Sequence, residues 1–343
     1  MKSLSLNRLQ SILDNLPRLT IGLIGDLFLD RYLELAANRH ETSLETGLEA
    51  YQIDRVRNAP GALGTVMNNL AALGVGRLLP VTVLGDDGHA FDLCKPLEAM
   101  PVDSRWILRD PNRLTPTYTK PLRPGAPGQW EELNRLDVRT LGPLSDATTQ
   151  RVCNAVREVW NVCDGLMVMD QINETNWGVV NDTVRQTLEQ LSRESPQKLL
   201  YVDSRRHLRC FGFGTLKGNR AEIQAAASSE TANDADAAGR LAARTGRTVF
   251  CTMGEEGILV ARPDQSSQRV EGCPVSGPID IVGAGDAASS GIVVSLLSGA
   301  SDVEAAGVGN MVASITVQQL GTTGTATPQQ VLDRWQSLNA VSS

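Results

Sequence analysis

Short apolar runs recur along the chain, and each is followed by a stretch in which hydrophobic positions have helical spacing. The runs are TIGLIGD, LLPVTVLGD, GLMVMD, KLLYVD and RTVFCT. Continuous apolar runs of this length are typical of strands that are buried on both faces, and their alternation with helices indicates a mainly parallel sheet. The pattern predicts a doubly wound α/β fold with helices on both faces of the sheet.

Two segments, near 32–58 and 113–140, show a different pattern, in which polar and apolar residues alternate. Alternation predicts antiparallel strands with one solvent-exposed face, and the turn-rich RPGAPGQ predicts a hairpin. We expect a small second sheet that projects from the main sheet as a lid; edge strands of the main sheet are the alternative. Residues 1–17 predict a short amphipathic helix, and residues 18–335 a single domain that carries the lid.

Composition narrows the class of ligand. With 343 residues, 41% of them hydrophobic, the chain can bury a full core. The net charge is −7 and the basic residues are scattered, so we expect neither a nucleic acid nor a membrane as partner, but a small molecule. No apolar run approaches the roughly 20 residues that span a bilayer. Six cysteines without a CxxC pair indicate reduced thiols and a cytoplasmic protein.

Polar residues stand where the predicted strands end. They are Asp26, Asp86, Asp170, Asp203 and Thr252. Each alone could be a helix N-cap. In open α/β sheets, however, ligands bind at the carboxyl ends of the strands, so five such residues together favour a binding site.

The segment IDIVGAGDAASSGIVVSLLSGA, residues 279–300, carries the most chemistry. Gly283, Ala284 and Gly285 precede a periodic apolar stretch, so we expect backbone N–H groups exposed at the positive end of a helix, which is an anion site. Asp286 beside this site can accept a proton from an attacking hydroxyl. The alternative is a tight loop in which glycine only supplies unusual dihedral angles.

The sequence DIVGAGDA resembles the second signature of the PfkB, or ribokinase-like, carbohydrate kinases, and the resemblance runs from Ile21 to Pro328. The family fold, a doubly wound α/β domain with a small β-sheet lid, agrees with the pattern above. The resemblance implies ATP and Mg²⁺ as cofactors and Asp286 as catalytic base, with residues 283–286 forming the anion hole. The family commonly has Thr directly before GAGD, where this chain has Val282.

Further motifs resemble the nucleotide side of the family. LKGNRAEIQAA resembles the NxxE motif, which implies that Asn219 and Glu222 organise magnesium and the phosphates, Glu222 through water; the alternative is an Asn cap with an acid in the first helical turn. TMGEEG resembles the TxGxxG turn near the nucleotide. The residues implied there are Thr252, Gly254 and Gly257, and Asn310 lies in a segment similar to the helix beside the adenine pocket, for which a solvated helix face is the alternative.

On the substrate side, GDLFLDRY, MNNLAALG, TYTKPLR and NRLD resemble the heptose-7-phosphate kinases, the kinase half of bifunctional ADP-heptose synthases. Carboxylates suit sugar hydroxyls and basic side chains suit a phosphate. The implied substrate residues are Asp26, Asp30, Glu45, Gly61, Lys120, Arg123, Asp170 and Arg205, with Arg206 as a further candidate. The chain departs from these kinases at Pro60 and Gly64, which replace a glycine and a sugar-contacting asparagine.

We therefore expect an ATP-dependent kinase that transfers the γ-phosphate to a hydroxyl of a sugar or sugar phosphate. The alternatives are a sugar- or nucleotide-binding pseudokinase, or a kinase of the same family for a ketose or a nucleoside. A homodimer formed through the lid is a further expectation. A dehydrogenase and a P-loop kinase are excluded, because neither G-x-G-x-x-G after the first strand nor GxxxxGK[ST] occurs.

Overall fold

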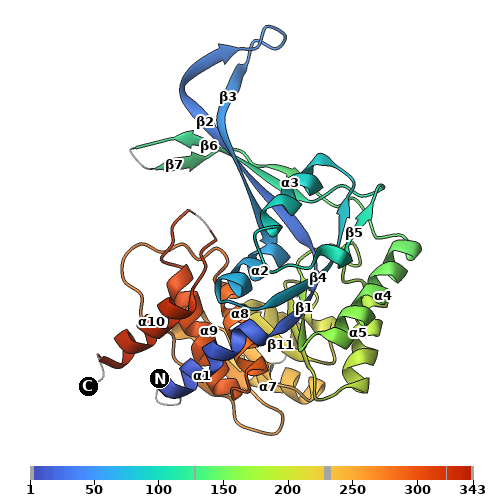
Figure 1. Cartoon of the computed structure of the whole chain (residues 1–343), viewed down its shortest axis with the longest axis vertical. Helices are drawn as coiled ribbons and strands as arrows, with labels where there is room; N and C mark the ends of the chain where they lie inside the picture. The colour runs from blue at the N-terminus through green and yellow to red at the C-terminus, as the bar shows by residue number, and fades with distance from the viewer. Residues whose placement is uncertain (1–3, 127–128, 228–232, 322, 341–343) are drawn as a thin grey trace.

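The computed structural model describes residues 4–126, 129–227, 233–321 and 323–340, which fold around a nine-stranded sheet (Figure 1). In spatial order its strands are β14 (Gln268–Val270), β13 (Ile258–Ala261), β12 (Val249–Thr252), β11 (Thr215–Asn219), β10 (Leu199–Ser204), β9 (Gly165–Asp170), β1 (Thr20–Gly25), β4 (Arg77–Gly85) and β5 (Ile107–Asp110). Pairing is parallel from β12 to β5 and antiparallel at β13 and β14.

The predicted strands are confirmed, because each of the five apolar runs forms one of these strands. β11, with the sequence TLKGN, was not predicted. It carries a single large apolar side chain, Leu216, and lies between β10 and β12, where Lys217 is also buried. Its neighbours, rather than its own hydrophobicity, make it a strand.

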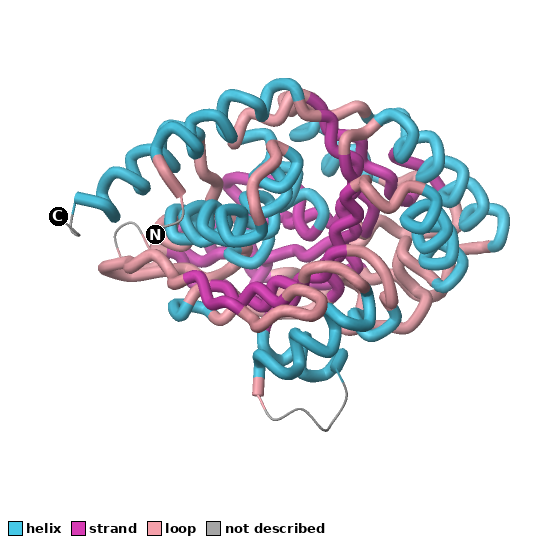
Figure 2. Tube along the Cα trace, turned by 90° about the horizontal axis from the view of Figure 1, so that it is seen from below, coloured by secondary structure: helices cyan, strands magenta, loops and turns pink. Residues whose placement is uncertain are grey.

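Helices cover both faces of the sheet, as Figure 2 shows. One face carries α1 (Leu6–Asn15), α2 (Leu63–Ala72), α3 (Gly88–Leu97), α8 (Ala284–Leu297), α9 (Asp302–Thr316) and α10 (Pro328–Ala340). The other face carries α4 (Asp146–Val162), α5 (Asp182–Glu194), α6 (Arg220–Ala227) and α7 (Asp234–Thr245). The doubly wound α/β fold is thereby confirmed.

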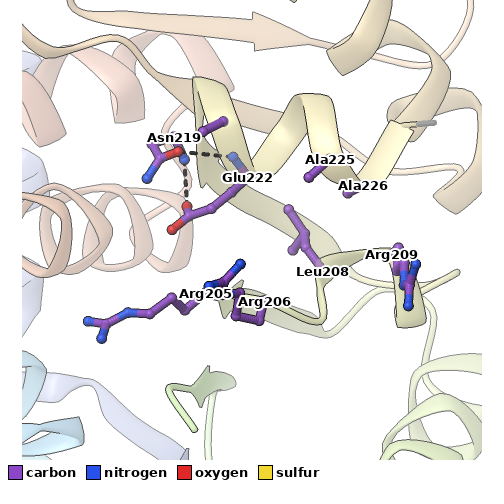
Figure 3. Close-up of a pocket in the computed structure, with 9 residues that line it drawn as sticks. Arg205, Arg206, Leu208, Arg209, Asn219, Glu222, Ala225 and Ala226 are labelled. Carbon is purple, nitrogen blue, oxygen red and sulfur yellow. Dashed lines mark hydrogen bonds between the residues drawn. The ribbon is translucent and has the colours of Figure 1, made fainter. Parts of the chain in front are cut away.

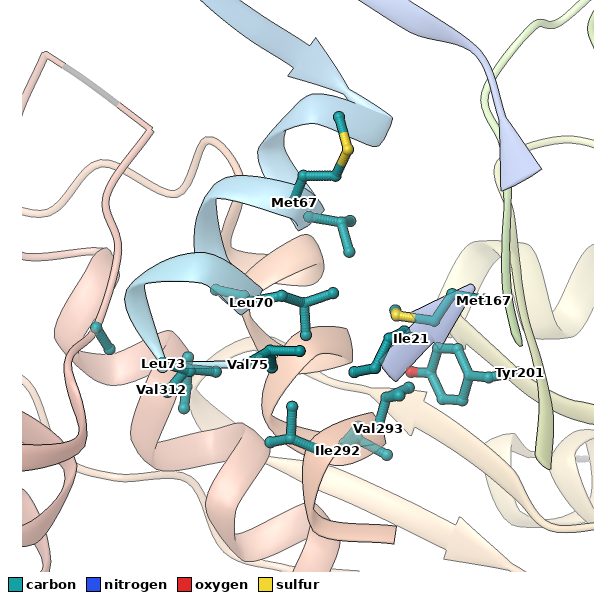
Figure 4. Packing of buried hydrophobic residues seen from close by; sticks show 14 of the residues in the cluster. Ile21, Met67, Leu70, Leu73, Val75, Met167, Tyr201, Ile292, Val293 and Val312 are labelled. Carbon is teal, nitrogen blue, oxygen red and sulfur yellow. The ribbon is translucent and has the colours of Figure 1, made fainter. Parts of the chain in front are cut away.

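The core consists of two hydrophobic clusters, one on each face of the sheet. Successive side chains of a strand point to opposite faces, so neighbouring residues contribute to different clusters. Met167 packs with Ile21 and with residues of α2 and α8 (Figure 4), whereas Val168 belongs to the cluster beneath α4 and α5. This packing fixes the ends of the central strands.

The segments with alternating polarity form a separate five-stranded sheet, called here the second sheet. Its strands are β2 (Leu27–Thr42), β3 (Glu49–Ala62), β6 (Thr117–Pro124), β7 (Trp130–Glu132) and β8 (Leu136–Val138). β2 pairs antiparallel with β3 and parallel with β6, and the β2–β3 hairpin projects from the body of the molecule (Figure 1). Residues 127–128 of the predicted hairpin turn lie outside the described residues. That the second sheet acts as a lid remains a prediction.

Two short joints connect the second sheet to the main body. β1 ends at Gly25 and β2 begins at Leu27, so only Asp26 lies between the two sheets. On return, β3 ends at Ala62 and α2 begins at Leu63. Ala62 has φ 54° and ψ −113°, a conformation that costs free energy for a residue other than glycine. The two sheets are therefore joined by very short connections, one of which has an unusual backbone conformation at Ala62.

Candidate functional site

The start of α8 meets the carboxyl ends of β10 and β11. Asp203 and Lys217 stand opposite each other in these parallel strands, and Lys217 Nζ donates a hydrogen bond to Asp203 Oδ2 at 2.7 Å. From α8, Ser289 Oγ donates to the same oxygen at 3.1 Å. These contacts fix α8 against the strand ends where the sequence predicted a ligand site.

The first turn of α8 has the geometry of an anion site. Gly283 caps the helix in the left-handed region, with φ 80°, which favours glycine. The amide of Ala284 donates to the Ile281 carbonyl at 3.1 Å. Among the residues that the structure describes, the amides of Gly285 and Asp286 have no protein acceptor. Two N–H groups at the positive end of the helix are therefore available to an anion.

Asp286 lies in an environment that disfavours its charge. Burial raises the pKa of this carboxyl to about 7, the negative charge of Asp203 adds to the effect, and the positive charges of Lys217 and Arg205 oppose it. A carboxyl group that titrates near neutral pH has the proton affinity suited to a general base. The role itself remains a prediction.

Asn219 and Glu222 bind each other at the start of α6. The amide of Asn219 donates to Glu222 Oε2 at 2.7 Å, and the amide of Glu222 donates to Asn219 Oδ1 at 3.0 Å. This reciprocal pair is the helix cap considered as the alternative. Both residues also line a cavity of about 290 Å³, with Arg205, Arg206 and Arg209 around it (Figure 3). The cap and a ligand-binding role are thus compatible.

The TMGEEG turn adjoins Asn219. Thr252 pairs with Asn219 in the register of β11 and β12. Gly254 and Gly257 have φ 62° and 95°, and a Cβ atom on Gly257 would lie 2.1 Å from the Val270 carbonyl oxygen. Glycine is therefore required at position 257 to bring this turn against the chain that follows β14.

Asn310 is buried rather than part of a solvated helix face, so that alternative is wrong. Its side chain is 8% exposed, and Nδ2 donates to the carbonyls of Val270 and Glu271 at 3.1 and 3.0 Å. The amide group thereby attaches α9 to the end of β14. A direct contact of Asn310 with a nucleotide would have to replace or share these bonds.

Asp30, Gly61 and Lys120 come together on the second sheet. Lys120 Nζ lies 3.0 Å from Asp30 Oδ1 and donates to the Tyr32 hydroxyl at 3.4 Å. A Cβ atom on Gly61 would lie 2.4 Å from Asp30 Oδ2. The Asp30 carboxylate therefore occupies the space that a side chain at position 61 would need.

Arg205 connects two cavities. It lines the cavity beside Asn219 and Glu222, and also a narrower one lined by Phe28 and Tyr118 of the second sheet. Its amide donates to the Asp170 carbonyl at 3.1 Å, which holds the backbone at the end of β9. Within the described residues, its guanidinium forms no ion pair with an acidic side chain. This cation is therefore available to an anionic ligand from either cavity.

Two predicted substrate residues, Asp26 and Asp170, lie beneath the strand ends. Asp26 is 2% exposed, and its Oδ1 accepts from the amide of Val179 at 2.9 Å. Asp170 is 1% exposed and accepts from Ser204 Oγ at 2.9 Å; burial raises its pKa to about 7. Their placement at strand ends was predicted correctly, but neither carboxylate lines the two cavities. That they contact substrate directly remains a prediction.

Glu45 and Arg123 lie in the outer part of the second sheet. Glu45 is exposed in the turn between β2 and β3, and Arg123 is exposed near the end of β6, where Nη2 donates to the Tyr51 hydroxyl at 3.3 Å. Neither residue lines the two cavities: Glu45 lies in the turn of the projecting β2–β3 hairpin, and Arg123 lies near the end of β6.

The departure at Pro60 and Gly64 has a packing explanation. A Cβ atom on Gly64 would lie 2.3 Å from Pro60 Cβ and 3.0 Å from Leu27 Cδ1. Pro60 therefore fills the space that an asparagine side chain at position 64 would start from. The two replacements fit each other, and together they remove one polar group from this end of α2.

Lys217 was missed in the sequence. The signal was a charged residue inside a strand, two positions before Asn219, in a stretch with too few apolar residues to be recognised as a strand. Across the described ranges, no group of three or more His, Cys, Asp or Glu residues could hold a metal ion. The same residues include no helix long and apolar enough to cross a membrane.

The chain is similar in sequence to known proteins. Residues 205–330 match the family described as pfkB family carbohydrate kinase. A Bifunctional protein HldE from Trichlorobacter lovleyi is 25% identical over 332 residues, which cover 94% of this chain and 64% of the relative. Another, from Gluconobacter oxydans, is 29% identical over 308 residues, covering 88% of this chain and 61% of the relative. The chain thus spans less than two thirds of the length of these relatives.

Solved structures show the same fold. Arabidopsis thaliana ribokinase complexed with ribose and ATP superposes with a TM-score of 0.67 at 16% identity, over 92% of this chain and 98% of the other. A carbohydrate kinase from Agrobacterium tumefaciens gives a TM-score of 0.68 at 20% identity, over 92% and 96%. At these identities the similarity establishes the ribokinase-like fold.

Proposed function

We propose that this chain transfers the γ-phosphate of ATP to a hydroxyl of a sugar phosphate, with Asp286 as general base; the match of residues 205–330 to the pfkB family carbohydrate kinases supports the proposal. The family match and the ribokinase-like fold support a carbohydrate kinase in general. The sugar phosphate as substrate, Asp286 as the base and the residues that contact the nucleotide are proposed here.

One observation carries the proposal. Asp286 stands at the positive end of α8, where its pKa is raised to about 7, and the positive charge of Arg205, which lines both cavities, acts on it. One cavity adjoins the predicted nucleotide residues and the other adjoins the second sheet. A proton acceptor, free amides and a cation that reaches both cavities are the groups that phosphoryl transfer requires.

The proposed step is a single displacement. The acceptor hydroxyl gives its proton to the Asp286 carboxylate, and its oxygen forms a bond to the γ-phosphorus. The bond from that phosphorus to the β–γ bridging oxygen breaks, and ADP leaves. The amides of Gly285 and Asp286 and the guanidinium of Arg205 stabilise the negative charge that develops on the transferred group.

The residues present fit a magnesium ion held mainly by phosphate oxygens and water. Mg²⁺ commonly keeps several waters and takes only one or two carboxylates. Glu222 can serve such an ion through water while it accepts the hydrogen bond from Asn219. A bound Mg²⁺ would neutralise charge on the transferred phosphate.

The acceptor is a sugar phosphate similar to heptose 7-phosphate in this proposal. The Asp30 carboxylate, positioned by Lys120, can accept hydrogen bonds from sugar hydroxyls, and Arg205 offers two parallel donors to phosphate oxygens. The resemblance of GDLFLDRY to heptose-7-phosphate kinases favours the same class. The absence of an asparagine at position 64 removes one polar contact, worth about 1 kcal/mol, which alters preference without abolishing binding.

A substrate panel tests the function. With Mg·ATP, we expect ADP release with a sugar phosphate at a kcat/KM at least about tenfold above that of the matching unphosphorylated sugar, because an Arg–phosphate contact contributes more than 1.4 kcal/mol. Heptose 7-phosphates, hexose phosphates, hexoses, ketoses and nucleosides form the panel. Activity on ketoses or nucleosides alone would refute the proposed substrate class but not the kinase. Sugar binding by calorimetry without any ADP release would support the pseudokinase alternative.

Arg205 and Arg123 provide a matched pair of variants. We expect Arg205→Ala to lower kcat/KM for the sugar phosphate about 10- to 100-fold, since one charge-assisted hydrogen-bonded contact contributes about 1.5–3 kcal/mol. Arg123→Ala should change kcat/KM less than about twofold, because Arg123 lies on the exposed part of β6. Steady-state kinetics with both variants gives the comparison. Equal losses in the two variants would contradict the placement of the substrate beside Arg205.

A further inference from the structure

A buried ion pair lies directly beneath the first turn of α8. Lys217 and Asp203 are 5% and 4% exposed, and Lys217 Nζ lies 2.7 Å from Asp203 Oδ2. A Cβ atom on Gly285 would lie 3.0 Å from Lys217 Nζ. The ammonium group therefore sits close against the backbone of the proposed anion site.

Stability alone does not explain this pair. A buried ion pair seldom stabilises a fold more than apolar residues of similar size, because both charges lose their hydration. Phe250 of β12, which pairs with Lys217 in register and is buried, shows that apolar packing is available on this face of the sheet. The pair therefore calls for an explanation in the site that it adjoins.

The charges around Asp286 suggest what the pair does. The ionisable groups that act on this carboxyl are Asp203 and Tyr201 of β10, Arg205 after it, Lys217 of β11 and Glu222 of α6. Burial raises the pKa of Asp286, and the carboxylates Asp203 and Glu222 raise it further. Lys217 and Arg205 act in the opposite direction. Arg205 is exposed and screened by water, whereas Lys217 is buried and held in place by Asp203.

We propose that Lys217 is a positioning residue of the phosphoryl-transfer site: held by Asp203, its ammonium group keeps Asp286 ionised and able to accept the proton of the acceptor hydroxyl. This inference rests on the proposed function of Asp286. Lys217 needs no contact with either substrate to act in this way, because its charge acts through the buried space below Gly285.

The pH dependence of kcat/KM tests the proposal, because the two partners of the pair have opposite charges. In Lys217→Met, Asp286 loses a nearby positive charge that favours its ionised form, so the acidic limb of the profile should move to higher pH by about one unit. At a pH below the limb, kcat/KM should then fall about tenfold, and at alkaline pH most of this loss should be recovered. In Asp203→Asn, Asp286 loses a repelling charge, so the limb should move to lower pH. Lys217→Arg should retain the wild-type limb. Lys95→Met on α3, where Lys95 is exposed, is the control and should leave the profile unchanged.

A purely structural role for Lys217 predicts different results. Loss of activity by the same factor at every pH, or a limb that moves in the same direction in Lys217→Met and Asp203→Asn, overturns the proposal. If Lys217→Met is too unstable to assay, the double variant Lys217→Met/Asp203→Asn removes both charges and should return the limb close to that of the wild type; a limb that stays displaced contradicts the inference.

A second readout separates this inference from the proposed function. The Asp286 carboxyl can be titrated by NMR with ¹³C-labelled aspartate in the wild type and in Lys217→Met, without turnover. A chain that shows no kinase activity would refute the proposed function, while a shift of the Asp286 titration to higher pH would still support the link to Lys217. An unchanged titration would refute that link in an active kinase as well.

Discussion

Asp286→Asn is expected to lower kcat by about a thousandfold while ATP binds nearly as well as to the wild type. The amide is close in shape to the carboxylate but cannot accept the proton of the acceptor hydroxyl, and general base catalysis contributes about 10²- to 10⁴-fold. The amides of Gly285 and Asp286 remain at the start of α8, so the anion site persists. The loss should therefore appear in the chemical step.

Single-turnover kinetics and calorimetric titration of nucleotide measure the two parts of this expectation separately. Asp14→Asn, at an exposed position of α1, is the matched control and should leave both unchanged. Near-normal turnover in Asp286→Asn would show that another group is the base. Unchanged chemistry with a strong loss of nucleotide affinity would place Asp286 in binding instead.

The raised pKa of Asp286 adds a stability effect to the same variant. The folded protein holds a proton on this carboxyl up to about pH 7, whereas an unfolded aspartic acid releases it near pH 4. Between about pH 4 and 7 the carboxyl is ionised in the unfolded chain but still protonated in the folded one, so the free energy of unfolding falls as the pH rises. The full loss is present above pH 7. Asp286→Asn removes this cost, so its melting temperature at pH 8 should exceed that of the wild type.

Gly61→Ala is expected to raise KM for the sugar substrate about a hundredfold without changing ATP affinity. The new Cβ atom would lie 2.4 Å from Asp30 Oδ2, so the carboxylate must move from the place where Lys120 Nζ lies 3.0 Å from its Oδ1. A displaced Asp30 loses its hydrogen bonds to sugar hydroxyls, and a loss of about 2.8 kcal/mol corresponds to the stated factor.

Gly239→Ala is the control for this variant. Gly239 lies within α7, and nothing lies within 4 Å of an added Cβ atom, so the substitution should be neutral or slightly stabilising. Steady-state kinetics with varied sugar and with varied ATP gives both values of KM. An unchanged KM for the sugar in Gly61→Ala would show that Asp30 does not contact the substrate.

Most of the fold could be predicted because its central strands are continuous apolar runs. TIGLIG and GLMVMD must be buried on both faces, and burial of that kind requires covering helices. β11 could not be predicted in the same way, since TLKGN becomes a strand only through hydrogen bonds to β10 and β12. Lys217, a buried cation next to the start of α8, was missed together with that strand.

The candidate site was predicted in part. The motifs around Asp286 and Asn219 are local, so their spacing along the chain already places them at helix starts. Asp26 and Asp170 show the limit of such reasoning, because a position at a strand end does not tell whether a carboxylate points into a cavity or beneath it. Arg123 shows another limit. It lies near the far end of β6, away from Arg205, and the length of β6 depends on its pairing with β2, which the sequence does not give.

Because the β2–β3 hairpin is joined to the main body at Asp26 and Ala62, a rotation at these joints displaces each residue in proportion to its distance from them. β2 extends over 16 residues from its joint, or roughly 50 Å at about 3.3 Å per residue. A tilt of about 5° at the joint would then move the hairpin tip by roughly 4 Å, but Asp30, four residues from Asp26, by only about 1 Å. Any tilt at the joint would thus be larger at the tip than at Asp30. A fluorescent probe attached to the hairpin tip would therefore detect a tilt of β2 that displaces Asp30 by only about 1 Å.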